Sequence, residues 1–222
     1  MNKYSKDLIS TFKRHTHADN AFYMKKYMRD QFDYFGIKTP LRRVILRDFI
    51  KQNGLPQQNE METVVWELWK HPNRECVYAA IEILAKDKKN WREGSIKLFE
   101  KLALRKSWWD SVDAIEGYLV GPYFKLFPEK IKRVTGKWNS SKNIWLQRLS
   151  ITFQLMYKKQ TDEKLLFNYI IKLKNSEEFF VQKAIGWALR QYARTDPKSV
   201  KRFVHSIQLK PLSIREALKH IS

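Results

Sequence analysis

Val181-Gln182-Lys183-Ala184-Ile185 carries the same order of apolar and polar residues as Leu146-Gln147-Arg148-Leu149, which lies 35 residues earlier in the chain. The same interval separates three comparable stretches nearer the N-terminus: Ser111-Val112-Asp113-Ala114-Ile115, Cys76-Val77-Tyr78-Ala79-Ala80-Ile81 and Leu41-Arg42-Arg43-Val44-Ile45. A fixed period of this length, with two helices in each unit, is typical of stacked helical repeats, although HEAT repeats usually span about 40 to 47 residues. The sequence therefore predicts an α-solenoid of HEAT-like helical repeats.

The remaining pattern also indicates helices. Apolar residues recur at three and four positions along almost the whole chain, and no segment alternates as a strand would. Ser141 and Ser176, also 35 residues apart, are expected to act as N-caps because a hydroxyl accepts from unpaired first-turn amides. We therefore expect an all-α fold in which residues 1–222 form a single domain, with the last helix cut short at Ile221-Ser222.

The charge of the chain predicts a polyanionic partner. Lys and Arg number 43 against 23 Asp and Glu, which gives a formal net charge of +20. Such a surplus fits either nucleic acid or an anionic membrane face. The chain has no apolar run of about 18 residues and no basic tail beside an anchor, so the membrane is the weaker interpretation. We expect binding to nucleic acid and no membrane association.

Cysteine, histidine and glycine usage argues against several other classes. Cys76 is the one cysteine, so no disulfide can form within the chain, and its apolar surroundings predict a buried thiol. His15 and His17 are the only close histidine pair and lie in basic surroundings, where exposure is expected rather than metal binding. The seven glycines form no phosphate-binding loop. We expect a cytoplasmic monomer without metal or cofactor.

The repeat register predicts which side chains share one surface. Equivalent positions of stacked helices form a row, and that row contains Arg43, Tyr78, Asp113, Arg148 and Lys183. Each charge taken alone fits an ordinary solvated face, but here one carboxylate stands among cations. We expect a basic concave groove in which Arg43, Tyr78 and Lys183, together with Arg190 farther along the last helix, contact DNA.

A cluster of tryptophans surrounds the acidic position of the row. Trp109 lies four residues before Asp113 and therefore on the same helix face, whereas Trp108 is rotated towards the expected core. Trp187 lies one turn beyond Lys183 and should project from the same surface. For each tryptophan alone, a role as an apolar anchor between helices is the simpler interpretation. Together, two tryptophans, an aspartate and an arginine are expected to converge.

The stretches around these residues resemble those of AlkD-like DNA glycosylases, and the resemblance covers nearly the whole chain. It is carried above all by Lys106-Ser107-Trp108-Trp109-Asp110-Ser111-Val112-Asp113, Asn143-Ile144-Trp145-Leu146-Gln147-Arg148 and Phe179-Phe180-Val181-Gln182-Lys183-Ala184-Ile185-Gly186-Trp187. The resemblance implies an enzyme that removes cationic N3- and N7-alkylated purines from double-stranded DNA in base excision repair. It also implies that Asp113 is the catalytic aspartate, Arg148 the arginine beside it, and Trp109 and Trp187 the pair flanking the lesion nucleotide.

The residue types suit that chemistry independently of the resemblance. A cationic purine leaves without protonation, and a fixed carboxylate opposes the positive charge that grows on the sugar. Arg148 is expected either to hold a phosphate or to fix Asp113. In the alternative interpretation, Asp113 and Arg148 only join two repeats of a non-catalytic nucleic-acid binder or scaffold, because a repeat fold does not by itself establish activity.

Overall fold

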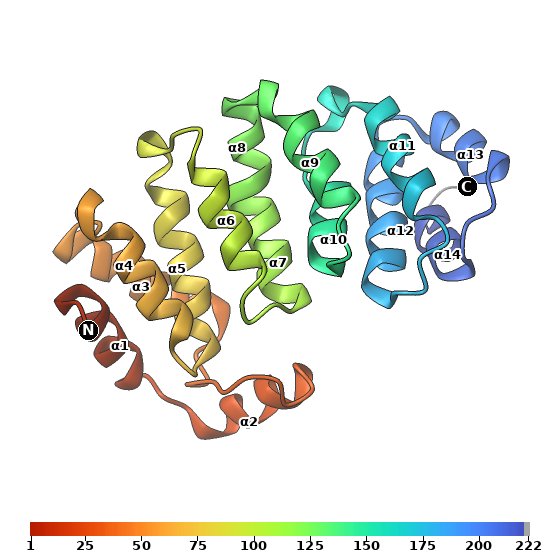
Figure 1. The fold of residues 1–222 in the computed structure, drawn as a ribbon. Coiled ribbons are helices and arrows are strands. Elements are labelled where there is room, and N and C mark those ends of the chain that lie inside the picture. Colours follow the sequence, from red (N-terminus) through yellow and green to blue (C-terminus); the bar gives the residue numbers. More distant parts are fainter. Residues whose placement is uncertain (220–222) are drawn as a thin grey trace. The chain divides into compact units, whose positions relative to one another are not determined.

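The computed structural model of the chain describes residues 1–219, and its helices form two compact units, Met1–Trp91 and a second that begins at Arg92 (Figure 1). Over these residues there is no β-strand, and the one isolated bridge joins Asp33 and Asn73. The predicted all-α class of helical repeats is confirmed. That residues 1–222 form a single domain stays a prediction, and Ile221-Ser222, where the last helix was expected to be cut short, lies outside the described residues.

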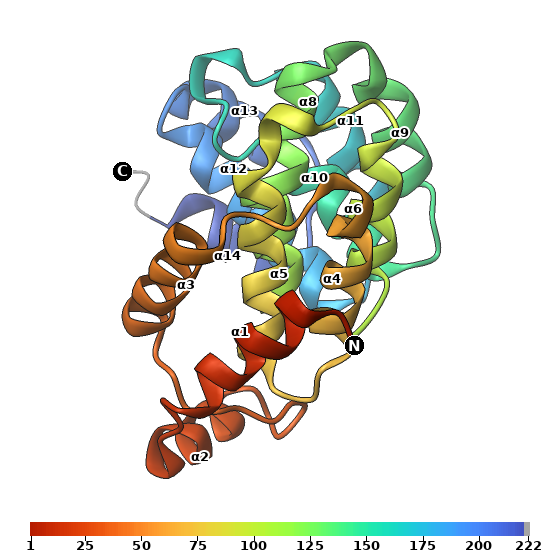
Figure 2. The ribbon, with the colours of Figure 1, turned by 90° about the vertical axis from the view of Figure 1, so that its left-hand side faces the viewer.

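The first unit contains α1 (Lys3–Lys13), α2 (Ala18–Tyr27), α3 (Thr39–Asn53), α4 (Gln58–Lys70), α5 (Arg74–Lys86) and a 3₁₀ turn at Lys88–Asn90. Short connections join α4 to its neighbours, and α4 packs against α5, as both views of the ribbon show (Figures 1 and 2). Cys76 lies in α5 and is fully buried, as its apolar surroundings predicted.

A buried carboxylate fixes the segment between α2 and α3. The backbone amides of Phe35, Gly36 and Ile37 donate to the carboxylate of Glu75, at 3.1, 2.9 and 3.1 Å. Gly36 has a φ of +89°, and a Cβ atom there would lie 2.1 Å from the carbonyl oxygen of His17. Burial raises the pKa of Glu75, and the amide hydrogen bonds oppose that rise. The segment is thereby tied to the first turn of α5.

The second unit contains most of the predicted site. Its helices are α6 (Ser95–Ala103), α7 (Trp109–Ile115), a π-helical turn (Glu116–Val120), α8 (Gly121–Leu126), α9 (Ile131–Asn139), α10 (Ile144–Thr152), α11 (Glu163–Leu173), α12 (Phe179–Ala193), α13 (Pro197–Ser206) and α14 (Pro211–Leu218). Two 3₁₀ turns, Pro128–Lys130 and Lys158–Gln160, lie in the connections before α9 and α11. No helix of the described chain is long and apolar enough to cross a membrane.

Helix α12 packs against both α10 and α14 and lies between them in Figure 1. Its buried residues recur at helical spacing, with Val181, Ala184, Ile185 and Ala188 facing the core of the unit. On the α14 side, Gly186 allows a close approach, because a Cβ atom there would lie 2.4 Å from the Cβ of Glu216. A side chain larger than hydrogen at this position would separate the two helices.

Equivalent hydrogen bonds confirm the 35-residue period within this unit. The side-chain amide of Gln147 donates to the carbonyl of Ser141 at 2.7 Å, and that of Gln182 donates to the carbonyl of Ser176 at 3.1 Å. The N-cap prediction for the two serines is wrong, however. Each hydroxyl instead accepts from the amide two residues later, and that later residue holds the N-cap position of α10 or α12.

Candidate active site

Helix α7 presents the predicted acidic residue on its outward side. Val112 and Ile115 are fully buried and fix the inward face of this short helix. Trp109 and Asp113, one turn apart, therefore share the opposite face, and both are partly exposed. The Asp113 side chain keeps 22% of its surface accessible, which leaves one carboxylate of the buried site open to a ligand.

Arg148 of α10 binds Asp113 through two parallel hydrogen bonds. Nε donates to Oδ1 at 2.7 Å and Nη2 to Oδ2 at 2.9 Å, while Nη1 donates to the carbonyl oxygen of Phe180 at 2.9 Å. The arginine side chain is only 5% exposed. Of the two roles expected for Arg148, the geometry supports fixing Asp113, since the guanidinium directs three donors at groups of the chain itself.

Burial and charge act in opposite directions on Asp113. Burial raises the pKa of the Asp113 carboxyl, and the nearby charge of Asp110 adds to that rise. The charge and hydrogen bonds of Arg148 lower it. The pKa of Asp113 is raised overall, because the loss of hydration destabilises the carboxylate more than the single guanidinium stabilises it. The ionised group is therefore a stronger base than an exposed aspartate.

Trp187 of α12 lies beside this ion pair, and Trp109 lies one turn before Asp113 on α7. The guanidinium carbon of Arg148 lies 5.5 Å from the ring centre of Trp187, which also packs against the core of the unit. Trp109 shares the face of Asp113 on α7. Four predicted residues thus come from α7, α10 and α12, and the structure directly joins Asp113 to Arg148 and Arg148 to Trp187.

Three aromatic rings support the site from behind. Trp108 packs against Trp145 and Phe180, with ring-centroid distances of 6.2 and 5.3 Å, and Trp145 lies 4.9 Å from Phe180. Trp108 therefore makes aromatic contacts as a core residue would, but it is only partly buried, whereas full membership of the core was expected. Phe180 has a second task, because its carbonyl accepts from Arg148, and a backbone acceptor of this kind gives no signal in the sequence.

Glu116, which the sequence analysis missed, lies directly behind Asp113. It begins the π-helical turn three residues after Asp113, and it is only 4% exposed. Its pKa is raised well above the ordinary value by burial and by the charge of Asp113, with Arg148 acting in the opposite direction. The spacing of three residues on a predicted helix was the available signal.

The predicted DNA contacts Lys183 and Arg190 share a carboxylate on α14. Glu216 accepts from Lys183 Nζ at 2.9 Å and from Arg190 Nη1 at 2.6 Å. These two hydrogen bonds are the main reason that the pKa of Glu216 is lowered to about 2. The two cations are therefore partly neutralised by an acidic residue that the repeat register did not include.

The two predicted DNA contacts of the first unit lie on α3 and α5. Arg43 is exposed and lies 3.5 Å from the carboxylate of Glu82. Its neighbour Arg42 is buried, binds the same carboxylate at 2.8 Å and lies over the ring of Tyr78 at 5.1 Å. Tyr78 is thus half-buried against one arginine, and Arg43 keeps the more exposed position.

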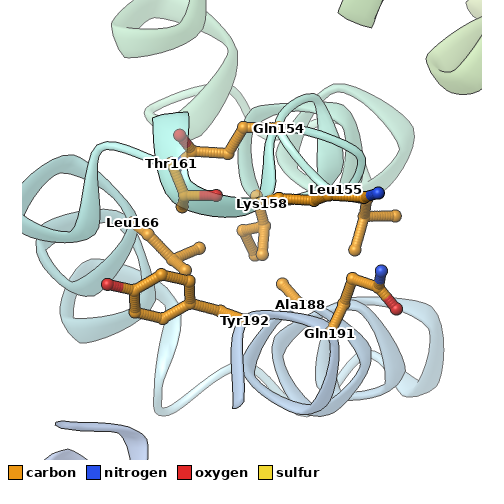
Figure 3. A pocket seen from close by; sticks show the side chains of 9 residues that line it. Gln154, Leu155, Lys158, Thr161, Leu166, Ala188, Gln191 and Tyr192 are labelled. Carbon is orange, nitrogen blue, oxygen red and sulfur yellow. The ribbon is translucent and has the colours of Figure 1, made fainter. Parts of the chain in front are cut away.

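The described residues contain no cluster of three or more His, Cys, Asp or Glu side chains suited to a metal ion. A separate small pocket lies between the segment after α10 and helix α12, lined among others by Gln154, Lys158, Gln191 and Tyr192 (Figure 3). None of the residues lining that pocket belongs to the predicted site.

The fold and the site together define a helical-repeat protein with a carboxylate held by a buried arginine. The chain belongs to the DNA alkylation repair enzyme family, whose model matches residues 8–221. Its structure is similar to that of a predicted DNA alkylation repair enzyme from Enterococcus faecalis, with 30% sequence identity and a TM-score of 0.88 over 93% of this chain and 97% of the other. No curated protein matches the chain significantly. Membership of this family gives the protein a role in DNA alkylation repair.

Proposed function

We propose that the protein is a DNA glycosylase that hydrolyses the N-glycosidic bond of cationic N3- and N7-alkylated purines in double-stranded DNA. The observation that carries the proposal is the burial, hydrogen bonding and remaining accessibility of the Asp113 carboxylate. The carboxylate is largely buried and held bidentately by Arg148, the Asp113 side chain keeps 22% of its surface accessible, and the same arginine lies 5.5 Å from the ring centre of Trp187. A purely structural ion pair would not need a carboxylate that stays accessible.

The reaction needs one fixed carboxylate and no enzymic acid. The C1′–N bond breaks with its electron pair moving to the purine, which neutralises the positive charge that alkylation placed there. The sugar becomes oxocarbenium-like, and the negative charge of Asp113 opposes the positive charge that develops. A water molecule then adds to C1′, and its proton passes to Asp113 or to solvent. Arg148 holds the carboxylate in place through its two hydrogen bonds.

The two tryptophans suit contact with the sugar better than reading of the base. The faces of indole rings attract a cationic edge, so Trp109 and Trp187 would stabilise the same charge as Asp113. Many glycosylases instead enclose the flipped base in a pocket and read its hydrogen-bonding edge. In our proposal, selectivity comes from the weakened glycosidic bond of a cationic purine, and duplex DNA is held as a monomeric complex through its phosphates.

Release of free base tests the activity. The purified protein is incubated with duplex DNA containing one 7-methylguanine, and free base is measured by mass spectrometry beside a matched duplex containing uracil. We expect release of 7-methylguanine, with an abasic site left in the DNA, and no release of uracil, because a neutral base lacks the built-in charge. Binding of both duplexes without any release would instead indicate the non-catalytic binder, in which the Asp113 and Arg148 pair only joins α7 to α10.

Adduct size tests the absence of a base-reading pocket. Bulky cationic N7 adducts should be released at rates within about tenfold of 7-methylguanine, since an unenclosed base meets no wall. Trp109→Ala and Trp187→Ala should slow all accepted adducts by similar factors. A steep fall in rate with adduct size, or tight inhibition by free alkylated base, would reveal a pocket shaped to the base.

A further inference from the structure

Glu116 is a buried carboxyl group for which neither the fold nor the proposed reaction gives an immediate role. It follows α7 directly, as the first residue of the π-helical turn Glu116–Val120 that leads into α8. Pro122, in the first turn of α8, has no N–H to donate, which fits a widened turn just before it. π-Helical turns inside longer helices occur frequently at functional sites. The irregular turn therefore coincides with the end of the helix that carries Asp113.

The carboxyl group of Glu116 is not engaged by another side chain of the described residues, although the charge of Arg148 acts on it. Among the described residues, its carboxyl group makes no hydrogen bond or ion pair within normal distances. A Cβ atom at Gly121 would lie 3.7 Å from its Oε1, which places the backbone of Gly121 close to the carboxyl. Tyr157 is nearby, but its hydroxyl donates to the carbonyl oxygen of Gly121 at 2.7 Å.

The charges that act on Glu116 are those of Asp113 and Arg148. The other charged residues on the helices packed against the turn are Asp110 of α7, Lys97, Glu100 and Lys101 of α6, and Lys125 of α8. Of these, Glu100 accepts from Trp138 Nε1 at 2.6 Å, and Lys125 lies 4.8 Å from the ring centre of Tyr157. One guanidinium therefore faces two buried carboxyl groups, and it directs both of its carboxylate-binding hydrogen bonds at Asp113.

We propose that Glu116 is a positioning residue that, as the neutral acid, backs the Asp113–Arg148 pair and leaves Arg148 wholly to Asp113. The inference rests on the proposed function for its catalytic meaning. A second buried negative charge would lack a counter-ion, so the proton resides on Glu116, the more enclosed of the two acids. The direction of its pKa shift agrees with this assignment. Ionisation of Glu116 would draw Arg148 away from Asp113 and loosen the geometry that catalysis needs.

The first test measures the protonation of the Glu116 carboxyl and needs no assay of activity. The ¹³Cδ resonance of Glu116 in the wild-type protein should titrate well above the ordinary range of glutamate. Because the folded-state pKa is raised, the wild-type protein loses stability as pH rises from the unfolded value towards the folded one. Glu116→Gln removes that loss, so its unfolding temperature should exceed that of the wild type at pH 7 by at least about 2 °C.

The stability difference has a clear control. The gain of Glu116→Gln over wild type should shrink as pH falls towards 4, whereas Glu129→Gln, which removes an exposed carboxyl, should show no such dependence. Titration of Glu116 in the ordinary range would overturn the proposal. So would a Glu116→Gln protein whose stability relative to wild type is the same at pH 4 and pH 7. The wild-type titration decides the matter even if the variant folds poorly.

The second test connects Glu116 to the reaction. Glu116→Ala should slow single-turnover release of 7-methylguanine at least tenfold, and Glu116→Gln should recover most of that loss because an amide is also neutral. Release by wild type should decline at alkaline pH as Glu116 ionises, and release by Glu116→Gln should not. Equal rates for the alanine and glutamine variants would overturn the positioning role. Absence of release from every form would count against the proposed function alone, while the titration still decides where the proton lies.

Discussion

At Asp113, the pKa of the carboxyl depends on how completely Arg148 offsets burial. Burial has the larger effect and raises the pKa, while two hydrogen bonds from the Arg148 guanidinium lower it. A lysine in place of the arginine would keep the charge but lose the planar fork that binds both carboxylate oxygens at once. It would also lose the hydrogen bond to the carbonyl of Phe180. Replacing Arg148 by lysine should therefore disturb the orientation of the Asp113 carboxylate more than its ionisation.

Arg148→Lys tests this view of the pair. We expect excision to slow by about 10²-fold, as for other losses of preorganised electrostatic groups. The acid limb of the pH–rate profile should also move to higher pH, because weaker hydrogen bonding leaves the pKa of Asp113 further raised. Arg133→Lys, at an exposed position of α9, is the matched control and should leave the profile in place. An unshifted acid limb in Arg148→Lys would show that the arginine does not set the ionisation of Asp113.

The sequence predicted which residues lie together where those residues occupy equivalent positions of the 35-residue repeat. Asp113 and Arg148 are one period apart, so equivalent helix positions brought them together, and the structure shows the contact. Glu116 and Glu216 were missed because neither occupies a register position. Glu116 lies three residues after Asp113 and so outside the 35-residue row, and Glu216 belongs to α14, which packs against α12.

At the level of helices, the contact between α12 and α14 depends on one missing side chain. Gly186→Ala would place a Cβ atom 2.4 Å from the Cβ of Glu216 and 2.9 Å from the carbonyl oxygen of Ser213. Overpacking of this kind typically costs about 1–3 kcal/mol, which corresponds to a lower unfolding temperature of a few degrees. Differential scanning calorimetry should show that decrease.

The matched control for the packing argument is Gly94→Ala. Gly94 has helical backbone angles before α6, and a Cβ atom there meets nothing within 4 Å. That change should therefore be neutral or slightly stabilising. If Gly186→Ala unfolds at the same temperature as Gly94→Ala, the close approach of the two helices does not constrain position 186.

Helices were predicted more reliably than the details of their ends. Apolar spacing located α10 and α12, and their equivalent glutamine hydrogen bonds confirm the period. The caps were misassigned by two residues, because Ser141 and Ser176 accept from amides just outside the helices instead of from their first turns. A hydroxyl satisfies either arrangement, so residue type alone does not distinguish them.

For the whole molecule, the charge of +20 should dominate the affinity for DNA. If the protein neutralises about six phosphates, affinity should fall by about 10³-fold between 50 and 200 mM salt, because condensed counter-ions are released on binding. Fluorescence anisotropy with an unmodified duplex measures this dependence, and an uncharged peptide nucleic acid duplex is the control. An affinity that stays flat across this salt range would contradict an electrostatic grip on the backbone.

Composition and period together predicted the class of the whole chain but not its balance of charges. The all-α repeat class follows from the recurrence of apolar residues every three or four positions, because paired helices need this spacing to bury their apolar faces. Carboxylates that pair with the expected DNA contacts, Glu82 beside Arg43 and Glu216 beside Lys183, do not appear in a count of net charge. The predicted basic groove therefore stays a prediction that rests on the surplus of cations rather than on these residues alone.

The central claim is that Asp113 supplies the charge for base excision, and Asp113→Asn tests it most directly. Single-turnover release of 7-methylguanine from duplex DNA should be measured for wild type, Asp113→Asn and Asp110→Asn. We predict that Asp113→Asn binds the duplex at least as tightly, having lost a negative charge, but releases base about 10²- to 10³-fold more slowly, while Asp110→Asn stays within a few-fold of wild type. Undiminished release by Asp113→Asn would contradict the account.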